Sequence, residues 1–431
     1  MEELGTLLGE ALQRIVVTRG AGNQTIGIAT YRSNLIASWS LYSPDLRRHT
    51  LTFEPHITDP ILQDQIVGVI RSSLSEHVHE DRVQCGIYGV FGGFGNGFPL
   101  NYVLKNLLRI TIAHGPSAAA RSFYDATRSE HIAYQHVGLL SGVRTDRELH
   151  VSHGIRIVPL PSSTAELPPM LPDMVDIPTI QLLGRALVVV DATVSPALIN
   201  PEQIRTFDDA DAVFETSLVS DELPHFNLSR FCDALSLACG SSVRPAAEWN
   251  YMSEDHILNL RAGSGGMSYR PAELYDRGSS PLSQRNVRDA VSILQDRDSL
   301  PSETASKLDV PISRWVRAKG AGDQVGAFID LGIALESIYL SDIGSGSELG
   351  FRLGIRAAWY LGKDLDERSS IMDDLRKIYD LRSRAVHTGT LPSDASIAEL
   401  RARAEQLCLD SIRRVVSAGR FPDWASTVLG G

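Results

Sequence analysis

From about residue 284 onward, the sequence repeats one pattern. Apolar residues recur at steps of three and four, and Gly, Ser or Pro interrupts the runs. This spacing puts apolar side chains on one face of an α-helix and therefore predicts consecutive amphipathic helices. Such helices bury their apolar faces by packing together, so we expect a helical bundle. The predicted helices cover residues 284–297, 311–319, 322–340, 348–362, 365–387 and 394–417.

The N-terminal part has a different pattern, in which short β-branched and aromatic runs alternate with helical periodicity. This mixture is typical of an α/β region. The predicted strands lie near residues 14–17, 25–31, 34–42, 83–91 and 133–143, and the predicted helices near 59–78 and 117–132.

A segment rich in Pro and Ser, residues 153–173, is interpreted as a linker. It precedes two predicted strands, 185–194 and 213–219, and a helix at 227–240. We therefore predict an α+β fold in three parts: a mixed α/β domain at 1–155, a middle region at 156–281 and an all-α bundle at 282–431.

Bulk properties indicate a folded cytoplasmic protein. Hydrophobic residues make up 43% of the chain and charged residues 22%, which is typical of globular proteins. The acidic N-terminal stretch has no signal-peptide pattern, and no apolar run is long enough for a membrane span. The four cysteines have no C-x-x-C spacing and no phosphate-binding glycine motif occurs, so we expect no metal and no cofactor.

The net charge of −11 disfavours broad, non-specific binding to nucleic acid. The charge is unevenly distributed, because residues 282–431 carry 20 basic and 21 acidic side chains. A nucleic-acid contact within the C-terminal bundle therefore remains compatible with the composition.

Arg382 falls on the apolar stripe of the helix at 365–387, and Glu336 interrupts an apolar stripe of the helix at 322–340. An unpaired buried charge costs several kcal/mol, so an inward arginine and an inward glutamate on neighbouring helices predict each other as partners. One interpretation is a structural ion pair that stabilises the bundle.

His387 adds a second interpretation for Arg382. It lies in the last turn of its helix, and Gly389 is positioned as the C-terminal cap. An imidazole near a fixed cation can exchange protons near neutral pH while the guanidinium holds phosphate oxygens. Spacing alone does not single out this pair, because five Arg-x(4–6)-His matches occur: Arg71/His77, Arg109/His114, Arg144/His150, Arg147/His153 and Arg382/His387.

The runs AFIDLGIALESIYL, FRLGIRAAWYLG and DDLRKIYDLRSRAVHTG supply context for the last match. Their order resembles the Apea-like branch of the HEPN superfamily, in which an "ALE" helix precedes an arginine-containing helix and a final Y-x-x-RS-x-x-VH-G helix. The resemblance covers roughly residues 284–418. Thr388 departs from the pattern, because the family often places Gly directly after the His.

The resemblance implies a metal-independent RNase whose catalytic residues are Arg382 and His387, with Ser383 and Glu336 in supporting roles. It also implies a groove formed where two bundles meet, hence a homodimer, with RNA as the substrate. In this hypothesis the protein is an antiviral-defence or stress effector, and residues 1–281 sense an unknown trigger or restrain the bundle.

Two alternatives remain open. The bundle is instead a non-catalytic dimerisation or nucleotide- or RNA-binding module, with Arg382 in a structural ion pair. More remotely, an enzyme site in the N-terminal region uses Arg109 and His114, whose β-branched surroundings indicate a strand or a helix exit. The histidines at 77 and 79 are interpreted as surface residues, and the glycine-rich run at 89–103 as a turn or loop.

Overall fold

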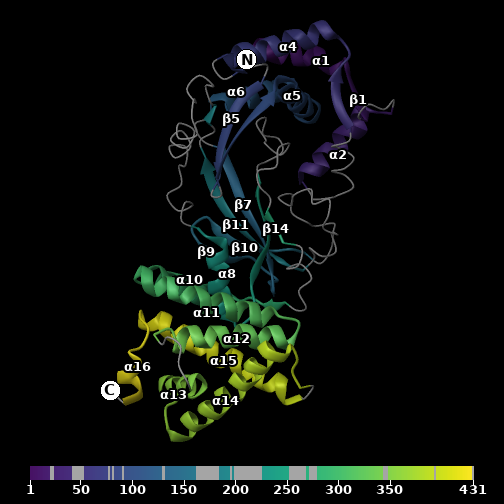
Figure 1. The fold of residues 1–431 in the computed structure, drawn as a ribbon. Coiled ribbons are helices and arrows are strands. Elements are labelled where there is room, and N and C mark those ends of the chain that lie inside the picture. The colour runs from purple at the N-terminus through teal and green to yellow at the C-terminus, as the bar shows by residue number, and fades with distance from the viewer. Residues whose placement is uncertain are drawn as a thin grey trace. The chain divides into compact units, whose positions relative to one another are not determined.

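A computed structural model gives the fold of the chain (Figure 1). It describes residues 1–19, 24–40, 53–75, 78–79, 82–89, 92–128, 132–161, 184–194, 197–198, 226–251, 268–270, 279–342, 348–392 and 395–429. Helices and mostly antiparallel sheets come first and a run of helices follows, which confirms the predicted α+β class.

The chain forms two compact units, and each unit gathers segments that are distant in sequence. The first consists of Met1–Leu139, Ser152–Phe226 and Ala247–Tyr269, and the second of Leu140–Val151, Asn227–Ala246 and Arg270–Gly431. The division into regions 1–155, 156–281 and 282–431 that we expected from the sequence stays a prediction.

In the first unit, helices pack around one apolar core beside a small antiparallel sheet of order β2-β1-β3. Leu4, Ile66 and Leu107, from three different helices, are each fully buried in this core. Asp59 begins α4 by accepting hydrogen bonds from the amides of Ile61 and Leu62, a normal N-cap. The elements are α1 (Glu2–Leu12), β1 (Ile15–Arg19), β2 (Thr25–Ile26), α2 (Ile28–Ser40), β3 (Phe53–Ile57), α4 (Pro60–Ser73), α5 (Leu100–His114) and α6 (Pro116–Arg128).

The structure corrects the strands predicted at 25–31 and 34–42. Only Thr25 and Ile26 are extended, and α2 occupies Ile28–Ser40. The helix is favoured because Tyr31 and Leu35, four residues apart, become buried together on the side of α2 that meets α5. Tertiary packing therefore overrides the β-propensity of this stretch.

The glycine-rich run is also corrected, because β6 (Gly92–Pro99) is a strand rather than a loop. It pairs along its whole length with β5 (Arg82–Gly89), in a register that sets Phe94 opposite Ile87 and Phe98 opposite Val83. Main-chain hydrogen bonds hold the two strands together even at the glycines, which have no side chain. The remaining strands of this sheet are β4 (Val78–His79) and β12 (Ala197–Leu198).

A six-stranded sheet has the order β14-β13-β7-β11-β10-β9. Its strand β10 corrects the start of the predicted linker, because these residues pair with β11 and bury Ile157. The later part of that linker and the strand predicted at 213–219 lie outside the described residues. The strands are β7 (Ile132–Ser141), β9 (Leu149–Ser152), β10 (Ile155–Pro159), β11 (Ala186–Val194), β13 (Arg244–Tyr251) and β14 (Ser268–Tyr269). Separately, β15 (Ser280–Pro281) pairs in parallel with β8 (Val143–Arg144).

The second unit contains the predicted bundle and one helix from the middle of the chain (Figure 1). All six predicted helices are present. Helix α11 begins nine residues before its predicted start, because Pro311, which we expected to begin the helix, lies inside it. The elements are α8 (Leu228–Cys239), α10 (Gln284–Asp298), α11 (Ser302–Gly320), α12 (Gln324–Tyr339), α13 (Leu349–Leu361), α14 (Leu365–Thr388), α15 (Ala395–Ala418) and α16 (Trp424–Leu429).

Local sequence explains where these helices begin and end. Ser283 and Asn286 form a capping box at the start of α10, and Asp323 and Asp364 cap α12 and α14. Gly389 adopts the left-handed conformation after α14, with φ of 66°, as the sequence predicted.

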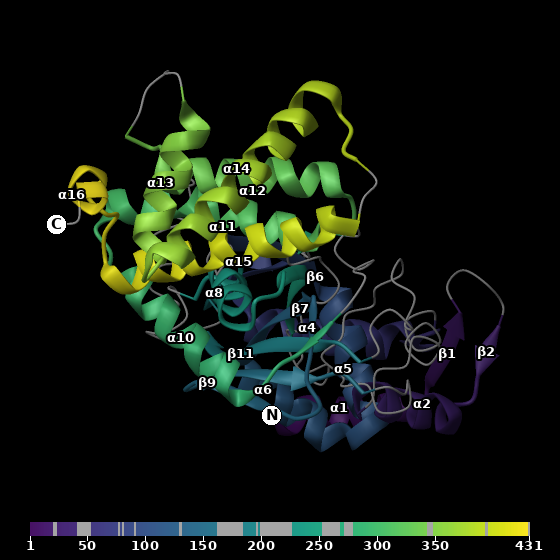
Figure 2. The same ribbon diagram turned by 90° about the horizontal axis from the view of Figure 1, so that it is seen from below.

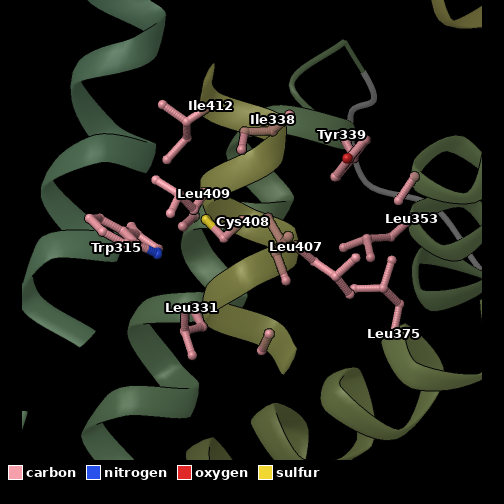
Figure 3. Close-up of a cluster of buried hydrophobic side chains, with 14 of the residues drawn as sticks. Trp315, Leu331, Ile338, Tyr339, Leu353, Leu375, Leu407, Cys408, Leu409 and Ile412 are labelled. Carbon is pink, nitrogen blue, oxygen red and sulfur yellow. The ribbon is translucent and has the colours of Figure 1, made fainter. Parts of the chain in front are cut away.

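Helix α12 is central to the bundle. It packs against α11, α13, α14 and α15 (Figure 2). Leu331 and Ile338 of α12 share the core with Trp315 of α11, Leu375 of α14 and Cys408 of α15 (Figure 3). Burial of such side chains contributes about 1.5 to 3 kcal/mol each, so α12 and α14 are held rigidly against each other.

Among the described residues, no helix is both long enough and apolar enough to cross a lipid bilayer.

Candidate active site at the contact of α12 and α14

The apolar stripe of α14 sets the direction of Arg382. Ile371, Leu375, Ile378 and Ala385 are all buried, as their spacing predicted. Arg382 lies one turn after Ile378 on this face, so its side chain points towards α12.

Gly332 of α12 makes this approach possible. A Cβ at residue 332 would overlap the Cγ of Arg382 and also lie 3.2 Å from its Cβ and Cδ. The aliphatic stem of Arg382 therefore crosses the α12 backbone at the one point in that turn where no side chain obstructs it. Sequence reasoning missed this residue, although a glycine within a helix was the available signal.

The stem directs the guanidinium to Glu336, one turn further along α12. Arg382 Nη2 donates to Glu336 Oε2 at 3.0 Å, which confirms the predicted pair. Each side chain retains 24% of its exposure, so the inward-facing Glu336 is partly rather than completely buried. The contact lies at the edge of the core because the pair is longer than the apolar side chains around it.

Electrostatic compensation within this pair is incomplete. Burial raises the pKa of Glu336 above its ordinary value of 4.5, and the Arg382 charge opposes this effect without cancelling it. Arg382 Nε is buried and has no hydrogen-bond acceptor among the described residues. A guanidinium with one carboxylate partner and spare donors is suited to bind a further anion.

His387 is exposed in the last turn of α14. It follows Arg382 by five residues, which corresponds to about 7.5 Å along the helix axis and about 140° around it. The two side chains therefore leave α14 in different directions, and within the described chain no hydrogen bond joins them. Ser383, the proposed supporting residue, is half-buried on the same helix.

Two open cavities in the second unit have volumes of about 660 and 480 Å³. Arg382, His387, Ser383 and Glu336 line neither of them. In a single chain, Arg382 and His387 therefore lie outside both cavities.

The alternative pair Arg109 and His114 lies in the first unit, on α5. This element is a helix with an extensive buried surface, so the interpretation of its surroundings as a strand is wrong, although His114 is indeed its last residue. The many β-branched residues are accommodated because they are packed in the core. Arg109 donates to Asn106 Oδ1 at 3.3 Å.

Of the two histidines at 77 and 79, the structure describes His79 alone. His79 lies in β4, and residues 76, 77 and 80 lie outside the described residues. Within the described ranges, no group of three or more His, Cys, Asp or Glu side chains is arranged to hold a metal ion.

Comparisons with family models, with curated proteins and with solved structures found no match to this chain.

Proposed function

We propose that this protein is a metal-independent endoribonuclease of the HEPN type that acts in the cytoplasm as a defence or stress effector. The observation that carries the proposal is an exposed histidine at the capped end of α14, which follows an incompletely compensated arginine. An imidazole can transfer the protons and a guanidinium can stabilise the phosphoryl charge in RNA cleavage without a metal.

In the proposed reaction, the 2′-hydroxyl of RNA attacks the adjacent phosphorus and His387 accepts its proton. The bond between phosphorus and the 5′-oxygen breaks, and the products are a 2′,3′-cyclic phosphate and a free 5′-hydroxyl. Arg382 stabilises the negative charge that develops on the phosphoryl oxygens. DNA lacks the attacking hydroxyl and is not a substrate.

The geometry of α14 favours a dimeric site. Because Arg382 and His387 point about 140° apart, one phosphate does not readily contact both side chains of one helix. Two copies that meet along α14 would supply two arginines and two histidines to one groove, and the second histidine would protonate the leaving oxygen. We propose this homodimer as the active species, with residues 1–281 responding to an unidentified trigger.

Cleavage of a labelled single-stranded RNA in EDTA tests the activity. We expect His387→Ala to reduce the rate by at least about 100-fold, because general acid–base catalysis contributes that much. His114→Ala, at an exposed histidine in the last turn of α5, is the matched control and should not change cleavage. Arg382→Ala is compared with Arg384→Ala, since Arg384 is an exposed arginine on the same helix.

The products and the substrate give independent checks. We expect cyclic-phosphate ends and no cleavage of a DNA of the same sequence. Since the trigger is unidentified, growth arrest on expression supplements the test, with the Arg382→Ala/His387→Ala double variant as the comparison. Equal cleavage and equal growth arrest by wild type and double variant contradict the proposal.

A second candidate is a non-catalytic binding or dimerisation module, and the observed Arg382–Glu336 contact favours it directly. Its stabilisation should lie between that of exposed and of buried pairs, at about 1 to 2 kcal/mol. If this candidate is correct, Arg382→Ala lowers the melting temperature, whereas His387→Ala affects neither folding nor growth.

A further inference from the structure

A second region of the bundle has the properties of a ligand site. The cavity of about 480 Å³ lies where α13 ends, α14 begins and the middle of α15 passes. Its volume is within the range of small-molecule pockets. None of the residues of the proposed active site lines it.

The polar lining is mainly cationic. Lys363, Arg403, Arg413 and Arg414 face two carboxylates, Glu367 and Asp410. Both carboxylates already accept hydrogen bonds from neutral donors, namely the main-chain amide of Lys363 at 2.8 Å and the Gln406 side chain at 2.8 Å. Four cations thus line the cavity beside two charged carboxylates, and one of the cations, Arg403, pairs with Asp374 outside the lining.

Two of the arginines are fixed without being neutralised. Arg413 lines both cavities, and its Nε donates at 2.9 Å to the carbonyl oxygen of Leu237, which lines the larger one. Arg414 donates to the Tyr360 carbonyl oxygen, and its guanidinium carbon lies 4.7 Å from the centre of the Tyr360 ring. Carbonyl groups and rings carry no full negative charge, so both side chains lose conformational freedom but keep their positive charge.

The other two cations retain free donors. Arg403 uses Nε for Asp374 at 2.9 Å, so the other edge of its guanidinium is available. Lys363 Nζ has no hydrogen bond or ion pair to any described residue. The site thus combines two fixed cations with a lysine that can close on a ligand.

The cavity also has an apolar side formed by Leu361, Ile371 and Leu407. We propose that this cavity binds a small phosphorylated molecule, with the phosphate held by the cations and an apolar or aromatic portion resting on these three residues. Inorganic phosphate and a nucleoside monophosphate share the required chemistry, and the apolar side favours the nucleotide.

Isothermal titration of the full chain at low salt tests the proposal with AMP, inorganic phosphate and adenosine as probes. We expect AMP to bind more tightly than phosphate, and adenosine to bind most weakly because it lacks the charged group. Lys363→Gln should weaken AMP binding about tenfold, the usual effect of losing one charge-assisted contact. Lys377→Gln, an exposed lysine on α14 outside the cavity, is the matched control and should leave affinity unchanged.

Arg414→Gln should weaken AMP binding further, but it also removes the bond to Tyr360. Charge reversal by Lys363→Glu tests the same point at a side chain without structural contacts and should abolish AMP binding. The proposal is overturned by an absence of saturable AMP and phosphate binding up to about 10 mM, or by affinities that Lys363→Glu leaves unchanged. An RNA oligonucleotide that alone binds in a Lys363-dependent way also overturns it and assigns the cavity to nucleic acid.

Discussion

Two arginines of the same bundle differ in how deeply they are buried and in how many carboxylates they contact. Arg297 of α10 retains 6% of its side-chain exposure and contacts two carboxylates, Asp233 of α8 at 3.5 Å and Asp309 of α11. Arg382 retains 24% and has one carboxylate partner, Glu336. The first is a saturated link between three helices, whereas the second has charge and donors in reserve.

The carboxylates show that burial dominates in both places. Burial raises the pKa of Asp233 and of Glu336, even though each accepts a hydrogen bond from an arginine that opposes the shift. The two pairs therefore differ in the number of carboxylates that contact the arginine. They do not differ in the direction in which the carboxylate pKa is shifted. A saturated arginine is explained by stability alone, whereas an unsaturated arginine near the surface also permits a role in binding.

Removing the saturated arginine should have the largest effect. Arg297→Met leaves Asp233 half-buried without its cation and should lower the free energy of unfolding by about 3 to 5 kcal/mol. Urea unfolding measures this loss. Arg285→Met, at an exposed arginine of the same helix, should change stability by less than about 0.5 kcal/mol. If Arg297→Met lowered the free energy of unfolding no more than Arg382→Met does, the distinction between the two arginines would be wrong.

Filling the space beneath Arg382 should have an intermediate effect. Gly332→Ala places a methyl group against the arginine stem, which must move away from Glu336, and should cost about 1 to 3 kcal/mol. Gly68→Ala in α4 is the control, because a Cβ there meets nothing within 4 Å and should stabilise that helix by about 0.5 to 1 kcal/mol. A neutral Gly332→Ala that leaves the Arg382–Glu336 coupling intact in a double-mutant cycle would contradict the close contact.

The pH dependence of stability should be the smallest effect, and it tests how burial acts on Glu336. Because the pKa of Glu336 is raised in the folded chain, its favourable contribution is complete below the ordinary value of 4.5 and is lost as pH rises through the raised value. Glu336→Gln should therefore reduce the loss of stability on going from acidic to neutral pH. Urea midpoints across this pH range provide the measurement.

Asp342 provides the contrast of opposite sign. Hydrogen bonds from Arg356 hold its pKa below the ordinary value of 3.8, so its contribution is present above that value and is lost as pH falls through the lowered pKa. Asp342→Asn should flatten the acid side of the stability curve and leave the other side unchanged. Identical pH profiles for the two variants would show that burial does not distinguish these carboxylates.

The sequence was most informative where one residue pattern was sufficient. The boundaries of α12 and α14 follow from their periodicity and from caps such as Asp364 and Gly389. The inward direction of Arg382 follows from its place on an apolar stripe. The two errors have different causes. Helix α2 forms because Tyr31 and Leu35 meet α5, which is distant in sequence. Strand β6 pairs with its immediate neighbour β5, and its glycines concealed the strand pattern.

The helices of the C-terminal bundle and their caps follow from the sequence, because they depend on near neighbours along the chain. The pairing of Arg382 with Glu336, 46 residues apart, was predicted instead from the inward position of each charge. Only the tertiary structure decided that Arg382 crosses α12 at Gly332, that Glu336 stays half-exposed and that Lys363 and Arg414 face one cavity. Those features are distances between side chains on different helices, and a one-dimensional pattern does not specify how closely two helices approach.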